Sequence, residues 1–261
     1  MIALVTGASS GIGEATARRL AREPGCRLVL VARRAERLQA LAGELGGATV
    51  LAEDLTDEGA PARIARAVED EHGHLDLLVN NAGAAWRGTF ADGGWENVHR
   101  HMELNFDAQV RLTEALLALL RRSAPSAIVN VASTAGRVSR ATSGAYSASK
   151  FALAGWSDAL HLEEAPHGVH VGLVLPGYVA TEGFPQAELV AHPLGRRLVS
   201  TPERVADAIV EAGPGGRAER YVPRPYWLAA AARILAPALV RRATAGGPLE
   251  LAPKTGPDEL R

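Results

Sequence analysis

The run Thr6-Gly7-Ala8-Ser9-Ser10-Gly11-Ile12-Gly13 is the stretch from which the fold of this chain is predicted. It follows a short apolar run, Ile2–Val5, and leads into a stretch typical of a helix at 12–22. Glycines in such a turn let the backbone approach a pyrophosphate closely, and the helix N-terminus offers unpaired N–H groups and a favourable dipole. Its place directly after a first strand favours a phosphate-binding loop over an ordinary tight turn. The expected contacts come from Gly7, Ser9, Ser10, Gly11, Ile12 and Gly13.

Beyond this turn, short apolar runs alternate with helical stretches. The expected strands are Ile2–Val5, Leu28–Val31, Thr49–Leu51, Leu75–Val79, Ile128–Val131, Val169–Leu175 and a short last one, Tyr221–Val222. The expected helices are 12–22, 34–45, 59–71, 95–121, 145–165 and 202–212. The strands are apolar along almost their whole length, as strands covered on both faces should be. The alternation predicts an α/β fold: a Rossmann-type doubly wound parallel sheet with helices on both faces.

Composition limits the domain count and the partners. A chain of 261 residues with 47% hydrophobic and 22% charged residues suits one domain, here 1–242. The stretch 243–261 is rich in glycine and proline and is expected to be a disordered tail. The formal net charge of -1 does not favour a nucleic-acid partner. No apolar run reaches the roughly 18 residues of a membrane span, and we expect no signal peptide before Thr6, so a cytoplasmic location is expected.

Cysteine and histidine offer little chemistry here. The single cysteine, Cys26, excludes an internal disulfide and is expected to be a buried spectator, because an apolar run follows it. The pairs His72-x-His74 and His99-x-His101 lack a third ligand with usable spacing, so no metal site is expected.

The end of the second strand should face the adenosine ribose of a dinucleotide. An acidic residue there would bond both ribose hydroxyls, whereas a basic one favours a 2′-phosphate. This chain has Arg33 and Arg34 there, which favours NADPH over NADH; the alternative is a pair of solvated charges at a helix start. Asp54, after the third strand, is a candidate acceptor for the adenine amino group, or else a turn or cap residue.

The fourth strand ends in Asn80-Asn81-Ala82-Gly83. Small residues leave room at the carboxyl edge of the sheet, where ligands of open α/β sheets bind. Asn81, Ala82 and Gly83 are therefore candidate cofactor contacts.

A serine, a tyrosine and a lysine follow with suggestive spacing. Ser133 ends the fifth strand, Tyr146 lies 13 positions later (146 − 133), and Lys150 lies four positions after that, about one helical turn. An ammonium beside a phenol lowers a pKa that is ordinarily ~10, which makes Tyr146 a candidate general acid/base. An isolated pair of this kind would more simply be a surface pair, but its place behind the glycine turn and Asn80–Gly83 favours catalysis.

Together these motifs resemble the short-chain dehydrogenase/reductase family, from Met1 to about Ala212. Thr6–Gly13 matches its Thr-Gly-x-x-x-Gly-x-Gly motif, Asn80–Gly83 its Asn-Asn-Ala-Gly motif, and Asn105, Ser133, Tyr146 and Lys150 its catalytic tetrad. Pro176-Gly177-Tyr178-Val179-Ala180-Thr181 resembles the segment that holds the nicotinamide carboxamide. This adds Pro176, Gly177, Val179 and Thr181 to the candidate cofactor contacts, beside Tyr146 and Lys150.

The resemblance implies a role for each member of the tetrad. Tyr146 would donate or remove the proton, Lys150 would lower its pKa and bind the nicotinamide ribose, and Ser133 would orient the substrate oxygen. Asn105, an unfavourable residue inside a helix, would hold a water in a proton relay. Hydride would pass between NADP(H) and a carbonyl or alcohol substrate; the alternative is a regulatory or scaffold protein that binds a dinucleotide without turnover. An epimerase or dehydratase of related fold is a lesser alternative.

Two regions concern partners and the substrate. The resemblance implies a homodimer or homotetramer that pairs the long helices 95–121 and 145–165, and a substrate-covering loop at 182–200. The segment 226–242 is strongly apolar but too short and interrupted to span a bilayer. Packing over the substrate pocket or at a subunit interface is favoured, and contact with a membrane surface, anchored by Trp227 and the arginines, is the alternative.

Overall fold

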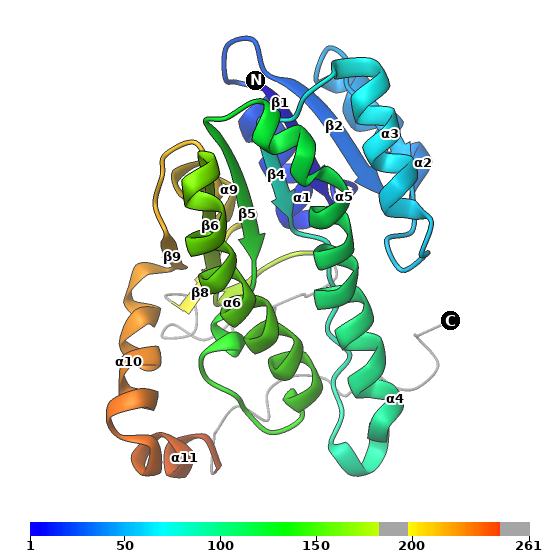
Figure 1. The fold of residues 1–261 in the computed structure, drawn as a ribbon. Helices are drawn as coiled ribbons and strands as arrows, with labels where there is room; N and C mark the ends of the chain where they lie inside the picture. The colour runs from blue at the N-terminus through cyan, green and yellow to red at the C-terminus, as the bar shows by residue number, and fades with distance from the viewer. Residues whose placement is uncertain (183–197, 246–261) are drawn as a thin grey trace.

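The computed structural model describes residues 1–182 and 198–245 and contains one seven-stranded parallel sheet (Figure 1). The strands run in the order β3-β2-β1-β4-β5-β6-β9. Their bounds are β1 (Ile2–Thr6), β2 (Arg27–Ala32), β3 (Thr49–Ala52), β4 (Leu77–Asn80), β5 (Ser126–Val131), β6 (Val169–Pro176) and β9 (Glu219–Val222). Two short strands, β7 (Tyr178–Val179) and β8 (Val199–Ser200), pair separately.

Helices cover both faces of the sheet. One face carries α1 (Gly11–Leu20), α2 (Ala35–Glu44) and α9 (Pro202–Ala212), and the other carries α3 (Ala60–His72), α5 (Ala108–Arg122) and α6 (Gly144–Glu164). α4 (Phe90–Met102) leads into α5, and α10 (Trp227–Leu235) and α11 (Pro237–Ala245) end the described chain. Short turns are η1 (Glu103–Asp107), η2 (Thr134–Gly136), η3 (Ala165–His167) and η4 (Arg224–Tyr226). The predicted doubly wound fold is confirmed.

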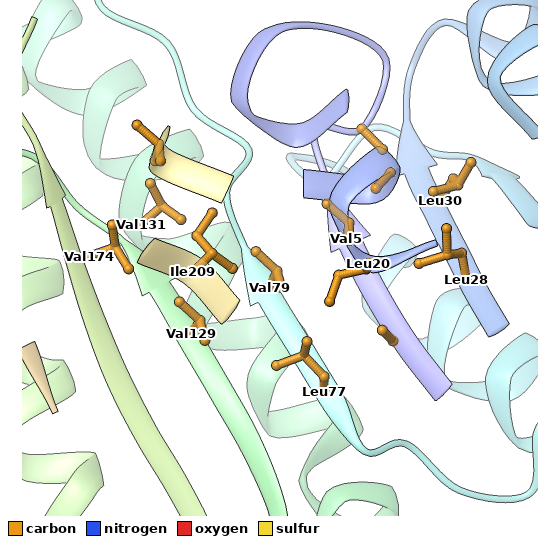
Figure 2. Close-up of a cluster of buried hydrophobic side chains, with 14 of the residues drawn as sticks. Val5, Leu20, Leu28, Leu30, Leu77, Val79, Val129, Val131, Val174 and Ile209 are labelled. Atoms are coloured by element: carbon orange, nitrogen blue, oxygen red, sulfur yellow. The ribbon is translucent and has the colours of Figure 1, made fainter. Parts of the chain in front are cut away.

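The strands supply both core layers because successive side chains point to opposite faces. In β1, Val5 joins the core against α1, α2 and α9, whereas Leu4 joins the core against α3, α5 and α6. Figure 2 shows the first of these layers, with Ile209 of α9 and Leu20 of α1 among the strand valines and leucines. A sheet covered on both faces therefore explains why the strands are almost continuously apolar.

The order of the strands reverses between β1 and β4. After β3 the chain crosses to the far side of β1 and continues with β4, β5 and β6. The helices that follow β1 and β4 cover opposite faces of the sheet, and ligands of open α/β sheets bind at the carboxyl ends of the strands at such a point. The residues singled out by sequence lie around this edge.

The prediction of one continuous helix at 95–121 is wrong, because this region is divided into α4, a π-helical turn and α5. The helix starts earlier, at Phe90, because Thr89 and Asp92 form a reciprocal capping box, and it has a non-helical residue at Gly94. It then passes through the π-helical turn Glu103–Asp107, which contains Asn105, before α5 begins at Ala108. Such turns interrupt the regular i→i−4 ladder and are frequent at functional sites.

The C-terminal segment folds as two helices, and its largest apolar side chains are exposed to solvent. Trp227 of α10 is 53% exposed, Leu235 is 83% exposed and Leu239 of α11 is 67% exposed. Both helices lie beyond the carboxyl ends of the strands (orange and red in Figure 1). These exposed side chains therefore do not pack over a pocket of the chain itself. Tyr226, just before α10, does pack on Gly177. Within 1–182 and 198–245, no helix combines the length and apolar character needed to span a bilayer.

Two further expectations are corrected. The chain is still helical through Ala245, beyond residue 243 where the tail was expected to begin; 246–261 lie outside the described residues. Cys26 is half-buried rather than buried, because it lies at the edge of the core beside α1 and follows the open turn at Pro24 and Gly25. Burial still raises the pKa of its thiol.

The close packing of β6 against α9 predicts a cost for any side chain at Gly172. A Cβ there would lie 2.1 Å from the backbone oxygen of Ala212, so α9 would have to move. We expect Gly172→Ala to lower the free energy of unfolding by about 1–3 kcal/mol in urea denaturation. Gly43→Ala is the matched control, because a Cβ at this helical glycine meets open space and should not destabilise. Equal stability of Gly172→Ala and the wild-type chain would show that α9 does not pack this closely.

Candidate active site

The glycine-rich turn has the geometry of a phosphate cradle. Gly7 (φ +66) and Gly11 (φ +55) adopt left-handed conformations that other residues rarely tolerate. A Cβ on Gly13 would lie 2.2 Å from the Gly7 carbonyl oxygen, so only glycine lets the start of α1 approach the turn this closely. Ser9 and Ser10 complete the turn, and Ile12 packs at the margin of the core.

One hydroxyl joins this turn to the segment after β4. The Thr6 hydroxyl accepts hydrogen bonds from the backbone N–H groups of Asn81 and Ala82, both at 2.9 Å. The Asn81 side-chain amide donates back to the Thr6 carbonyl oxygen at 2.8 Å. Asn81, Ala82 and Gly83 are thereby held beside the cradle.

The two arginines after β2 behave differently. Arg34 reaches back to the cradle, with Nε 3.1 Å from the Ser9 hydroxyl and Nη2 2.7 Å from the Ser10 hydroxyl. Arg33 is exposed and lies 3.7 Å from an oxygen of Asp54. Arg34 is therefore the arginine that borders the predicted phosphate site.

Asp54 is held by its own turn. One carboxylate oxygen accepts hydrogen bonds from the backbone N–H of Thr56 at 3.0 Å and from its hydroxyl at 2.8 Å. Burial raises the pKa of Asp54, but these bonds and the Arg33 charge outweigh it, so the pKa lies below its ordinary value. This arrangement fits the turn-residue alternative and leaves contact with an adenine as a prediction.

Ser133 and Tyr146 meet beyond the end of β5. Ser133 is buried, receives a hydrogen bond from the Ala135 N–H at 3.1 Å and donates to the Pro176 carbonyl oxygen at 3.3 Å. Burial raises the pKa of the Tyr146 phenol above its ordinary value. Hydrogen bonding to Ser133 and the charge of Arg140 lower that pKa only in part.

Lys150 is buried one helical turn from Tyr146. Its Nζ donates to the Val131 carbonyl oxygen at 2.9 Å and lies 6.0 Å from the centroid of the Tyr146 ring. Burial lowers the pKa of Lys150 to about 8. Burial dominates the pKa of Tyr146, and Ser133 and Arg140 lower it in part; an effect of Lys150 on this pKa stays a prediction.

Asn105 closes the same site from the π-helical turn. Its side-chain oxygen accepts from the Ala84 N–H and its nitrogen donates to the Ala84 carbonyl oxygen, both at 2.9 Å. The nitrogen also donates to the Ser149 hydroxyl at 3.1 Å. A Cβ on Gly83 would lie 2.7 Å from the Asn105 side-chain oxygen and 3.5 Å from Lys150 Nζ, so both groups converge on Gly83.

The segment after β6 borders both halves of the site. The Pro176 carbonyl oxygen bonds Ser133, the Gly177 N–H donates to the Val222 carbonyl oxygen at 2.8 Å, and Val179 is buried. Thr181 lies against the cradle, because a Cβ on Gly11 would be 3.2 Å from its methyl group. The structure thus brings all the predicted motifs to one edge of the sheet. The predicted substrate-covering loop falls largely outside the described residues.

Several residues at the site have no assigned role in the sequence prediction. His101 is buried, with Nδ1 2.6 Å from the Asn97 carbonyl oxygen and Nε2 accepting from the Trp86 N–H at 3.0 Å. Its ring makes an edge contact with the Tyr146 ring at 6.1 Å between centroids. Burial lowers the pKa of His101, which fits a neutral ring between these two partners.

Arg140 and Tyr178 are the other additions. Arg140 Nη1 donates to the Tyr178 phenol, and the guanidinium lies 5.0 Å from the centroid of that ring. Arg140 falls between Ser133 and Tyr146 in the sequence, and Tyr178 follows Gly177. Their closeness in sequence to Ser133, Tyr146 and Gly177 was the only sequence feature that could have indicated these residues. No spacing rule predicts that an arginine in a loop contacts an active site.

The chain was compared with known proteins. Residues 1–189 match the family profile described as short chain dehydrogenase. The Bos taurus protein named dehydrogenase/reductase SDR family member 7B is 36% identical over 190 residues, which covers 69% of this chain and 58% of that protein. The match therefore spans less than two thirds of the bovine relative. Ketoacyl reductase HetN of a Nostoc species is 35% identical over 213 residues, or 80% of this chain and 74% of that protein.

Solved structures resemble the chain as well. A short-chain dehydrogenase from Streptomyces avermitilis has a TM-score of 0.77 and 30% identity, covering 89% of this chain and 92% of that one. The Pseudomonas aeruginosa RhlG/NADP active-site complex has a TM-score of 0.75 and 31% identity, covering 84% of this chain and 93% of that one.

The buried Lys150 predicts a pH-dependent stability in the absence of cofactor. Its pKa of about 8 in the folded chain lies below the ordinary 10.5, so between these values the unfolded chain binds more protons. The Lys150 contribution to the free energy of unfolding therefore rises with pH across this window, by at most about 1.4 kcal/mol per pH unit. Urea denaturation of the wild-type chain and of Lys150→Met from pH 7.5 to 10 should give a difference that increases with pH. A difference independent of pH would mean that Lys150 is not buried as described.

Proposed function

This chain belongs to the short-chain dehydrogenase/reductase family, and we propose that it transfers a hydride between NADP(H) and a carbonyl or alcohol substrate. The observation that supports this most is the convergence of Tyr146, Ser133 and Lys150 at the edge of the sheet that carries the glycine cradle. A cradle alone would suit any dinucleotide-binding protein, whereas a phenol beside a buried serine hydroxyl is built to exchange a proton.

In the proposed mechanism the substrate oxygen lies between Tyr146 and Ser133. The Ser133 hydroxyl orients this oxygen, and the Tyr146 phenol gives it a proton during reduction or removes one during oxidation. A bound nicotinamide supplies or accepts the hydride at the neighbouring carbon. At neutral pH Lys150 is protonated, because its pKa is about 8, and its charge favours the phenolate form of Tyr146.

We assign Asn105 to the proton relay, in which its contacts leave only its side-chain oxygen to bind a water. Both hydrogens of its side-chain nitrogen are donated, to Ala84 and to Ser149. Its oxygen accepts from the Ala84 N–H and has a second lone pair, which is the acceptor left for a water. Asn105 also fixes the loop after β4, so its substitution would disturb geometry as well as proton transfer.

NADP(H) is the proposed cofactor rather than NAD(H). Arg34 and the Ser10 hydroxyl lie together at 2.7 Å, and such a pair suits a 2′-phosphate, which prefers guanidinium and hydroxyl donors. Gly7, Gly11, Gly13 and Ser9 would bind the pyrophosphate, and Thr181 and Val179 the nicotinamide side. The P. aeruginosa structural relative was solved as an NADP complex.

We further propose a homodimer or homotetramer assembled through α4–α5 and α6. The α6 helix exposes Phe151, at 41%, and Leu162, at 75%, which suits a covered surface. A cytoplasmic location and the membrane-surface alternative for 226–242 remain predictions.

Tyr146→Phe tests the proton-transfer role. Removal of the phenolic oxygen should lower kcat about 10²- to 10⁴-fold with NADPH and a panel of ketones, while NADPH binding changes little. Tyr221→Phe is the matched control, because this phenol lies on β9 and should leave turnover near wild type. Undiminished turnover in Tyr146→Phe would contradict the mechanism. Tight NADPH binding by the wild-type chain with no turnover of any substrate would favour the regulatory or scaffold alternative.

Arg34→Ala tests the cofactor preference. Loss of a charged donor to a phosphate should raise the Kd for NADPH about 10- to 100-fold and change the Kd for NADH much less. Fluorescence titration of both cofactors measures this. Arg66→Ala, an exposed arginine on α3, is the control for loss of one positive charge. Equal weakening of both cofactors would argue against a 2′-phosphate at Arg34.

A further inference from the structure

An arginine, Arg140, lies near the proposed proton donor Tyr146, and a second arginine, Arg87, lies near Arg140. Arg87 follows the Asn80–Gly83 segment, and Arg140 lies between Ser133 and Tyr146. The two loops are joined by a hydrogen bond of 3.0 Å from the Gly88 N–H to the Thr142 carbonyl oxygen. Both arginines are half-buried, and the charge of Arg87 acts on Arg140.

The surroundings of Arg140 are unusual for a partly buried guanidinium. The guanidinium donates to the Tyr178 phenol and lies 5.0 Å from the centroid of its ring, with Tyr226 and Tyr146 also nearby. Among the described residues no carboxylate lies within ion-pairing distance of Arg140. By contrast Arg137, on the same loop, pairs with Glu219 at 2.8 Å. Neutral phenols surround the Arg140 guanidinium, but they do not neutralise its positive charge.

The electrostatic effects agree with this geometry. Burial lowers the pKa of Arg140, and the charge of Arg87 lowers it further. Burial likewise lowers the pKa of Arg87. The charge of Arg87 repels that of Arg140, and an anion bound at Arg140 would offset this repulsion. A neutral substrate would leave it in place.

We propose that the substrate carries an anionic group, a carboxylate or a phosphate, and that Arg140 binds it with help from Arg87. This inference rests on the proposed function, because it places the anion on the same molecule as the reacting carbonyl. The planar guanidinium of Arg140, held by its hydrogen bond to the Tyr178 phenol, would present its remaining N–H donors to the anion. The carbonyl would then reach Ser133 and Tyr146 from the same side.

Matched substrate pairs test this. With NADPH, kcat/KM is measured for acetoacetate against methyl acetoacetate, and for dihydroxyacetone phosphate against dihydroxyacetone. In the wild-type chain at least one anion should be preferred over its neutral partner about tenfold or more. The first pair reports a carboxylate and the second a phosphate, so the two sources of the anion are separated.

Variants of Arg140 locate the preference. Arg140→Gln should reduce the anion-to-neutral ratio of kcat/KM about 10- to 100-fold, and Arg140→Lys should restore it in part. Arg137→Gln removes a positive charge from the same loop and should retain the ratio. Tyr178→Phe removes the phenol oxygen that Arg140 contacts. If Arg140 acts only by holding Tyr178, this variant and Arg140→Gln will slow both members of each pair equally, which would overturn the proposal.

The remaining outcomes separate this inference from the proposed function. Turnover of the neutral ketones with no preference for either anion would overturn the inference and leave the oxidoreductase function standing. If none of the four compounds is reduced, calorimetric titration of the NADPH-loaded chain with acetoacetate and dihydroxyacetone phosphate decides. Binding that Arg140→Gln abolishes would support the anion site without the reaction. Binding that Arg140→Gln leaves unchanged, or no binding, would overturn it.

Discussion

A single buried hydroxyl, that of Thr6, connects the two halves of this molecule's site. It donates to the Val79 carbonyl oxygen at 3.1 Å and accepts the N–H groups of Asn81 and Ala82. Because β1 and β4 are neighbours where the strand order reverses, this one group fixes the cradle against the segment after β4. Gly83 follows this junction directly, and the Asn105 side-chain oxygen and Lys150 Nζ lie close to Gly83.

Positive charge gathers along this edge of the sheet. Lys150 is buried against a carbonyl oxygen and Arg140 contacts a phenol, whereas Arg34 contacts two serine hydroxyls and lies 3.9 Å from an oxygen of Glu182. Among the described residues Lys150 and Arg140 have no carboxylate partner, and such cations are costly in a partly dry site and favour anionic ligands. This edge therefore suits a phosphorylated cofactor at Arg34 and an anionic substrate at Arg140.

The local pattern of apolar residues predicted the strands well, because burial on both faces of the sheet determines where they form. The strands are apolar on both faces, and a sheet covered by helices on both sides is the arrangement that buries such strands. The pattern failed at Asn105, where the predicted continuous helix contains a π-helical turn. A tertiary contact, the paired hydrogen bonds between Asn105 and Ala84, accompanies that turn, and nothing within the helix sequence encodes a partner 21 positions away.

By itself the sequence determined the fold, the family and the motifs at this edge, though not His101 or Arg140, because these motifs depend on short spacings that the chain carries locally: glycines around a turn, or a tyrosine and a lysine one helical turn apart. Only the tertiary structure decided the electrostatics. It made burial the main influence on the Tyr146 pKa, engaged Asp54 in its own turn, and brought Arg140 near Tyr146. Charge interactions depend on distance and burial in space, and these arise only when loops far apart in the sequence meet.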